Sequence, residues 1–334
     1  MFRAIQFVGT QRSGSNLLRV MLNQSPEIAA PHPPHILKTF FPLLAGYGDL
    51  QQDDNFYQLV ADVCEWVNRN PVPWENVTLK TEDIFAACTN RTLVEIFQRI
   101  YEKKAAIKGA RYWCCKSMES IYYVKELEVS GIRPFYIYLY RDGRDVALSF
   151  MKAVVGPKHI YHLAQKWLTE QELSLQLKEQ VAEDRFIEVK YEDLISNPEA
   201  LLKRLCDKLD VAYSESMLQY FKSQESRITA ESGNMWKNVV RPILPNNHHK
   251  FLKELSLDEI RIFEAVAGEM LVKLGYERIT DDRDIAITED DIRRFNQENE
   301  KRMKQVLASA DPVELARRKP QEDLLELLKQ RVSV

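Results

Sequence analysis

The sequence predicts an α/β fold, in which a parallel β-sheet is flanked by helices and carries a helical cap and a helical C-terminal extension. The first observation lies in residues 3–22, where a short apolar strand pattern, a Gly/Ser loop and an amphipathic helix pattern follow one another. The second is the alternation of strand and helix patterns. The strand candidates are 3–8, 112–115, 134–140 and 185–190. Long helical patterns separate them, which requires crossover connections and therefore favours a parallel sheet.

The first strand candidate leads directly into a loop that suits an anion. This loop runs from Gly9 to Asn16, and an apolar helix pattern follows it. Backbone N–H groups of such a loop, with the unpaired N-terminal donors of the helix, can bind a phosphate. A Walker A loop would carry a lysine directly after its second glycine. Here the cation, Arg12, precedes Gly14, so the sheet is predicted to be P-loop-like with an arginine as the loop cation.

A second anion site is predicted at the end of the strand candidate 134–140. Arg141 follows this strand, and Ser149 comes eight residues later. Ligands bind at the carboxyl ends of the strands in open parallel sheets. A helix that starts near Asp145 would place Ser149 close to the same edge. A guanidinium and a hydroxyl presented together suit a second phosphate.

With these two motifs the chain resembles the sulfotransferases that use 3′-phosphoadenosine 5′-phosphosulfate (PAPS). The loop from Gln11 to Asn16 is similar to the family's loop for the 5′-phosphosulfate. Arg141 with Ser149 is similar to its 3′-phosphate motif. Tyr191-Glu192-Asp193-Leu194 resembles a third family segment, the turn after a strand. The resemblance covers roughly residues 3 to 275 and is of bacterial type, with a loop most similar to the tyrosylprotein sulfotransferase branch.

The resemblance implies a reaction and a set of residues. A sulfuryl group would pass from PAPS to a hydroxyl group of the acceptor by in-line displacement, with an amine as the second choice of acceptor. The product would be 3′-phosphoadenosine 5′-phosphate (PAP), and no metal would be required. Arg12 would contact the bridging and leaving oxygens, and Lys116, directly after the strand 112–115, would contact the sulfonate. The nucleotide-binding candidates are Arg12, Ser13, Gly14, Ser15, Asn16, Arg141, Ser149, Tyr191, Trp236 and Lys237. Arg227 or Arg241 are candidates to replace family cations missing near Trp236.

The general base is assigned by position. Phenol-type members of the family carry a histidine two residues after the lysine, where this chain has Met118, which cannot accept a proton. Other branches carry a glutamate about twenty residues beyond the loop, and a gap-free count reaches His32. A neutral imidazole is a competent base near pH 7. His32 is therefore the first candidate and His35 the second, and two glutamates, Glu82 and Glu119, are kept in reserve.

The remaining segments predict the helical parts. Residues 40–110 read as helices with Pro/Trp breaks and form the expected cap. Helices are expected over 160–181, from Pro198 onward and over 256–274, and 225–249 reads as irregular. Residues 1–280 are assigned to the sulfotransferase domain and the highly charged 281–334 to an extension. A capping-box pattern at Thr288 begins a helix with a thin apolar stripe, expected on the surface or in a dimer contact.

Composition limits the classes of partner. The 46 Lys and Arg residues against 49 Asp and Glu residues give a net charge of −3, which does not favour nucleic acid. The five cysteines lack metal-ligand spacing, which favours reduced thiols. No apolar run is long enough for a membrane span, and the first strand begins too early for a signal peptide. These features predict a cytoplasmic, bacterial enzyme without a metal site and with a possible homodimer.

Two other functions stay open at this level. A P-loop kinase or NTPase would need the Walker lysine and an acidic Mg²⁺ ligand after a second strand, and the strand 134–140 ends in Arg141 instead. A non-catalytic nucleotide-binding relic is the other alternative. The acceptor, whether small molecule, glycan, lipid or peptide, is not defined by the sequence.

Overall fold

The computed structural model describes residues 2–280 and 286–332. Its centre is a parallel five-stranded sheet of order β2-β3-β1-β4-β5. The strands are β1 (Arg3–Val8), β2 (Ile28–Ala29), β3 (Tyr112–Cys115), β4 (Phe135–Tyr140) and β5 (Phe186–Lys190). This confirms the predicted fold class. Because β1 lies between β3 and β4, the segments that follow these three strands emerge side by side at one edge of the sheet.

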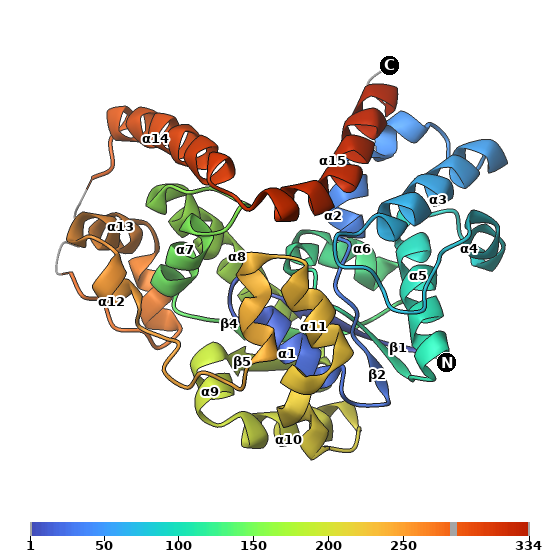
Figure 1. Cartoon of the computed structure of the whole chain (residues 1–334), viewed down its shortest axis with the longest axis horizontal. Helices are drawn as coiled ribbons and strands as arrows, with labels where there is room; N and C mark the ends of the chain where they lie inside the picture. The colour runs from blue at the N-terminus through green and yellow to red at the C-terminus, as the bar shows by residue number, and fades with distance from the viewer. Residues whose placement is uncertain (1, 281–285, 333–334) are drawn as a thin grey trace.

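Helices cover both faces of the sheet (Figure 1). One face packs on α1 (Ser15–Leu22), α9 (Tyr191–Ser196), α10 (Pro198–Leu209) and the 3₁₀ segment η4 (Glu215–Lys222). Toward the opposite side lie α6 (Val124–Val129), α8 (Ile160–Gln180) and the 3₁₀ segment η2 (Met118–Tyr123). Further along the carboxyl edge come α7 (Gly143–Met151), α12 (Phe251–Glu254) and α13 (Leu257–Lys273), which share one apolar cluster with α8. The short segment η3 (Glu183–Arg185) precedes β5.

The expected cap is helical. It comprises α2 (Ile36–Phe40), η1 (Phe41–Tyr47), α3 (Asp53–Asn68), α4 (Thr81–Ala87) and α5 (Leu93–Lys108). These elements have their own apolar cluster, to which two of the buried tryptophans, Trp66 and Trp74, belong. The cluster continues under β3 through Trp113. The cap is therefore fixed to the β3 side of the sheet by a shared core.

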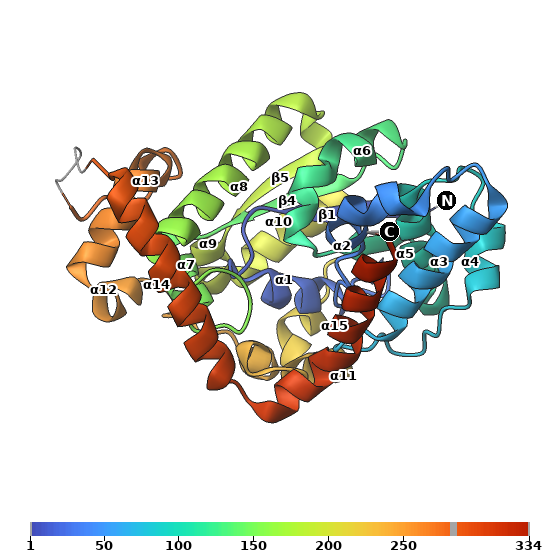
Figure 2. The same cartoon turned by 90° about the horizontal axis from the view of Figure 1, so that it is seen from above.

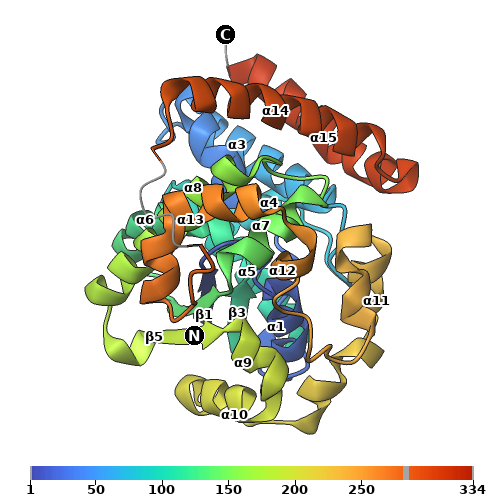
Figure 3. The ribbon, with the colours of Figure 1, turned by 90° about the vertical axis from the view of Figure 1, so that its left-hand side faces the viewer.

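The C-terminal helices α14 (Glu289–Ala308) and α15 (Pro312–Val332) form a V across the carboxyl edge of the sheet (Figure 2). Figure 3 shows the same pair lying over the other helices. On α14, Phe295 is buried, stacked on His159 and close to Tyr161. On α15, Leu324 and Leu328 belong to the apolar cluster of the cap. Among the described residues, no helix has the length and hydrophobicity needed to cross a bilayer.

Several predicted boundaries need correction. The two-residue strand β2 was not predicted, because a pair of residues carries no alternation that could reveal a strand. The segment 225–249 is not irregular throughout: it contains most of α11 (Gln224–Glu231) and the 3₁₀ segment η5 (Asn234–Val240). The helix expected over 256–274 is α13, and Ser256 forms a capping box with Glu259 in front of it. The Thr288 capping box is present, with Asp291 as its acidic partner.

Candidate active site

The loop between β1 and α1 adopts a strained backbone. Arg12 has a φ of 73° and Gly14 a φ of 89°, and a non-glycine residue in this region costs free energy. At Gly14 a Cβ atom would lie 2.4 Å from Cδ2 of the Tyr191 ring. Glycine is therefore required there for two reasons, the positive φ and the ring packed against it. The result is a tight turn that leads into the N-terminus of α1.

The structure brings the two predicted phosphate motifs together. The Nε of Arg12 donates a hydrogen bond to the Ser149 hydroxyl at 3.0 Å. A guanidinium N–H of Arg141 donates to the backbone carbonyl of Arg12 at 3.3 Å. Burial, and then the nearby positive charge of Arg141, lower the pKa of Arg12 to about 10. Arg12 is still protonated at neutral pH, so two guanidinium groups lie in one small volume, which favours a bound anion.

Arg141 is buried with few groups to neutralise it. It contacts the Asp145 carboxylate at 3.2 Å and donates to the Asn247 carbonyl at 2.9 Å. Its guanidinium carbon lies 4.4 Å from the centre of the Tyr191 ring, and its Nε has no hydrogen-bond partner in the described chain. The Tyr191 hydroxyl accepts a hydrogen bond from Asn247. Tyr191 thus lines the site mainly as a packing surface for Arg141 and Gly14.

Lys116 is the most unusual cation in the site. It follows β3 directly, is buried, and its ammonium makes no hydrogen bond or ion pair with any residue that the structure describes. Burial lowers the pKa of Lys116 to about 7, and the positive charges of Arg19 and Arg12 add to this effect. An unpaired buried cation is costly, so this position favours an anionic ligand.

The two candidate histidines lie between β2 and α2 and both line the site. His32 is buried with both ring nitrogens unpaired in the described chain, and its ring packs edge-on against Trp236 at 4.7 Å. His35 has a φ of 56°, and its Nδ1 is 2.8 Å from the Ser117 hydroxyl. Burial and the charge of Lys116 lower both pKa values, that of His35 to about 3. Both rings are therefore neutral at pH 7.

The two reserve glutamates are placed differently. Glu119 lines the site, but it is ion-paired with Lys38 at 2.7 Å and approached by Lys166 at 3.5 Å, and its pKa is lowered. Glu82 lies on α4, accepts a hydrogen bond from the exposed Tyr57, and is not among the residues that line the pocket. The structure therefore brings only Glu119 near the site, as a paired carboxylate.

A cavity of about 590 Å³ joins these groups. It runs from the β4 side, where Arg141 and Ser149 lie, past Arg12 and Lys116 to the cap. Trp236 lines it, but Lys237, Arg227 and Arg241 line a separate pocket of about 580 Å³. Lys237, predicted to bind the nucleotide, therefore lines a different pocket from Arg141. Ser13, within the loop, is buried and is not among the residues that line the cavity, and its hydroxyl has no partner in the described chain.

Some lining residues were not foreseen from the sequence. Lys152 and Lys250 reach the cavity on the Arg141 side, and Arg318 reaches it from α15. Exposed lysines and a distant helix carry no local motif, so only the assembled fold reveals them.

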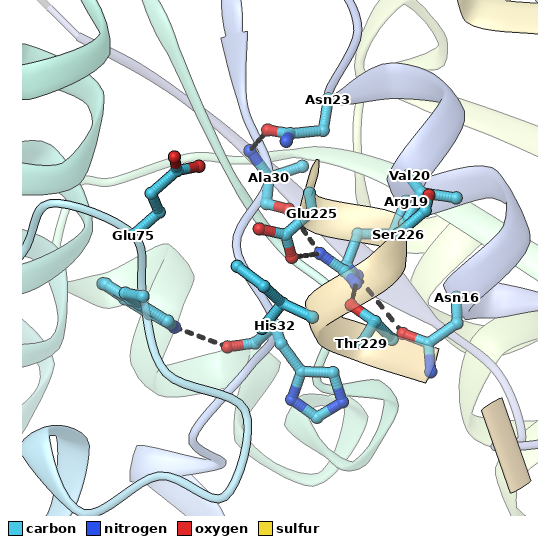
Figure 4. Close-up of polar contacts among 12 residues, drawn as sticks. Asn16, Arg19, Val20, Asn23, Ala30, His32, Glu75, Glu225, Ser226 and Thr229 are labelled. Carbon is cyan, nitrogen blue, oxygen red and sulfur yellow. Dashed lines mark hydrogen bonds and ion pairs between the residues drawn. The ribbon is translucent and has the colours of Figure 1, made fainter. Parts of the chain in front are cut away.

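A buried ion pair joins helix α1, which follows the loop, to helix α11 (Figure 4). Arg19 of α1 is fully buried and pairs with Glu225 of α11. It also donates to the Thr229 hydroxyl at 2.7 Å and to the Ala30 carbonyl at 2.9 Å. In Figure 4 the His32 ring points away from this cluster. Breaking a buried pair of this kind is strongly destabilising. The contacts of Arg19 therefore hold α1 against α11 and against Ala30, which directly follows β2.

The geometry can be compared with known proteins. Residues 5–215 match the sulfotransferase family. The chain is 22% identical over 278 residues to protein-tyrosine sulfotransferase A of Caenorhabditis elegans, covering 80% of this chain but 66% of that protein, just under two thirds. It is 23% identical over 302 residues to a protein of Caenorhabditis briggsae described as a putative protein-tyrosine sulfotransferase, covering 87% and 95%.

Solved structures agree in fold. The sulfotransferase domain of the Synechococcus PCC 7002 olefin synthase is 25% identical, with a TM-score of 0.52, and the alignment covers 80% of this chain and 94% of that one. The sulfotransferase domain of the curacin biosynthetic pathway is 20% identical, with a TM-score of 0.50, covering 83% and 99%. Because the family match spans more than half of the chain, the protein belongs to the sulfotransferase family.

Proposed function

We propose that the protein transfers the sulfuryl group of PAPS to a hydroxyl acceptor. The observation that carries this proposal is the contact between the loop and the β4 motif, in which Arg12 meets Ser149 and Arg141 beside the unpaired Lys116. Phosphosulfate and 3′-phosphate groups are anions of the size and charge that such a cluster of cations favours.

The proposed roles follow the direction in which charge develops. Arg141 and Ser149 bind the 3′-phosphate, with Lys152 and Lys250 as further cations on that side. Backbone N–H groups of the loop, with Ser15 and Asn16, bind the 5′-phosphate. Arg12 and Lys116 neutralise the bridging oxygen and the sulfonate as the sulfur–oxygen bond breaks. Trp236 covers the nucleotide.

His32 is proposed as the base that removes the acceptor proton. Its ring is neutral and both its nitrogens are unpaired within the described chain. Burial, and after it the positive charges of Lys116 and Arg19, lower the pKa of His32. The negative charge of a bound donor would raise the pKa of His32 and so favour proton transfer. His35 is the second candidate, because one of its nitrogens already contacts Ser117.

A kinase function finds less support. The acidic residue after β4 is Asp142, whose carboxylate is bound to the buried Arg144 and is therefore not free for a Mg²⁺ ion.

Calorimetry with PAP and with ATP tests the proposal. Tight binding of PAP in EDTA, with weak ATP binding, is the expected result. Binding of ATP only when Mg²⁺ is present would favour a kinase, and binding of neither nucleotide would favour a relic. A cytoplasmic location and a homodimer remain predictions, and sedimentation of the purified protein tests the second.

A further inference from the structure

The C-terminal helix α15 forms part of the wall of the cavity. Three of its side chains, Arg318, Gln321 and Leu325, line the cavity. The adjacent positions Leu324 and Leu328 are buried in the apolar cluster of the cap. A helix that buries one side in a core and turns its neighbouring side to a cavity is held in a defined orientation.

Polar contacts attach α15 to both sides of the cavity. Glu314 accepts a hydrogen bond from the backbone N–H of Asn234, at the start of η5, at 3.0 Å. The Arg318 guanidinium lies 5.6 Å from the centre of the Trp236 ring. Gln321 donates to the carbonyl of Trp66, on α3, at 2.9 Å. The helix therefore bridges η5, which lies beside the proposed nucleotide site, and the cap.

At the end of the cavity beside α15, charged side chains are paired with side chains of opposite charge. Arg318 is paired with Glu314 at 2.9 Å, and Lys38 is paired with Glu119 at 2.7 Å. Both histidines are neutral because burial lowers their pKa values. Lys116 is the unpaired cation nearby, and the proposed mechanism assigns it to the sulfonate. An acidic acceptor would therefore lose water without gaining a free cation here.

The uncharged part of this wall is apolar. Trp66, Pro33, Pro71 and Leu325 all line the cavity on the cap side. Such surfaces gain free energy by covering an apolar body.

We propose that α15 forms the outer wall of the acceptor subsite and that the acceptor is an uncharged hydroxyl compound with an apolar body. This rests on the proposed function, which supplies the donor and the base. A peptide acceptor, which the sequence left open, is the alternative that the test below includes.

Calorimetry on the full chain saturated with PAP tests this inference with three probes: 2-naphthol, 1-octanol, and a peptide with one tyrosine flanked by glutamates. We expect at least one of the two neutral probes to bind more tightly than the peptide. Leu325→Trp should weaken that binding by roughly 10-fold or more, because the larger side chain fills the subsite. Leu325→Ala, which cannot clash, should weaken it by a smaller factor.

Leu327→Trp is the matched control, because Leu327 lies on the same helix with 60% of its surface exposed. It should leave all probe affinities unchanged, and PAP affinity should be equal in every variant. Tighter binding of the acidic peptide, no binding of either neutral probe, or equal effects of Leu325→Trp and Leu327→Trp would overturn the inference. Failure of the wild-type protein to bind PAP would instead count against the proposed function.

Discussion

Arg141 tests the 3′-phosphate assignment at the scale of one residue. Its guanidinium is buried and its Nε has no partner in the described chain. Loss of a charge-assisted bond to phosphate costs about 1.5–3 kcal/mol. Arg141→Ala should therefore weaken PAP binding by roughly 10- to 150-fold in calorimetry. Arg227→Ala, in the separate pocket, is the control and should leave PAP affinity unchanged. Equal losses in both variants would contradict the assignment.

In the protein without bound donor, the buried charge of Lys116 should lower the free energy of unfolding. The same charge is proposed to stabilise the transition state of the reaction. Burial lowers its pKa to about 7, whereas an unfolded lysine keeps its proton up to pH ~10.4. The penalty is therefore complete below pH 7 and disappears as the pH rises toward 10. Lys116→Met should stabilise the apoprotein by about 1–4 kcal/mol at pH 6.5 and lower kcat by about 100-fold or more.

Thermal unfolding of wild type and Lys116→Met between pH 6.5 and 10 measures this difference. The gain in stability should shrink as the pH rises. A variant less stable than wild type at pH 6.5 would show that the ammonium has a stabilising partner in solution.

His32 tests the identity of the base. Loss of a general base costs about 10²- to 10⁴-fold in rate, so His32→Ala should lower kcat by that factor and leave PAP binding nearly unchanged. Because burial lowers the pKa of His32 well below 6.5, the acidic limb of kcat/KM for PAPS, which reports the enzyme before the donor binds, should lie at a pH below 6.5 and vanish in the variant. His35→Ala should have the smaller effect. The assignment fails if His32→Ala keeps full activity while Glu119→Gln loses it.

At the scale of the elements, the strand–loop–helix unit could be predicted almost completely. The apolar runs of β1 and β3 gave both bounds, and β4 and β5 begin one residue later than expected. Arg12, Arg141 and Ser149 could be placed because each is tied to a strand end by a short local motif. The Arg19–Glu225 ion pair could not be predicted, because the two residues are 206 positions apart and neither belongs to a local sequence motif.

A substitution at Gly14 tests the strand–loop–helix unit formed by β1, the loop and α1. Alanine there would meet the Tyr191 ring at 2.4 Å as well as an unfavourable φ. Gly109 at the end of α5 has a φ of 71°, and a Cβ atom added to it would meet no described neighbour within 4 Å. Gly109→Ala therefore isolates the backbone cost of about 1 kcal/mol. Gly14→Ala should lower stability by more than this control and, unlike it, weaken PAP binding by roughly 10-fold or more. Unfolding in urea and calorimetry measure the two effects.

At the scale of the whole molecule, the described extension is joined to the cap core rather than lying free on it. Arg331 of α15 pairs with Asp62 of α3, and the Tyr47 hydroxyl donates to the same carboxylate. Helix α15 therefore covers part of the cap, although the cap residues that it contacts are more than two hundred positions away in sequence. We infer that the stability of the cap depends on α15.

Two adjacent leucines test this dependence. Leu328 is 1% exposed within the cap cluster, whereas Leu327 is 60% exposed on the same turn. Leu328→Ala removes buried apolar contacts and leaves a cavity, so it should lower the free energy of unfolding by about 2–5 kcal/mol. Leu327→Ala should change it by less than about 0.5 kcal/mol. Urea unfolding gives these values, and hydrogen exchange locates them: in Leu328→Ala, amides of α3 should exchange faster together with those of α15. If Leu328→Ala accelerated exchange in α15 alone, the helix would be an independent appendage, and the wall of the acceptor subsite would have to be formed by the cap without it.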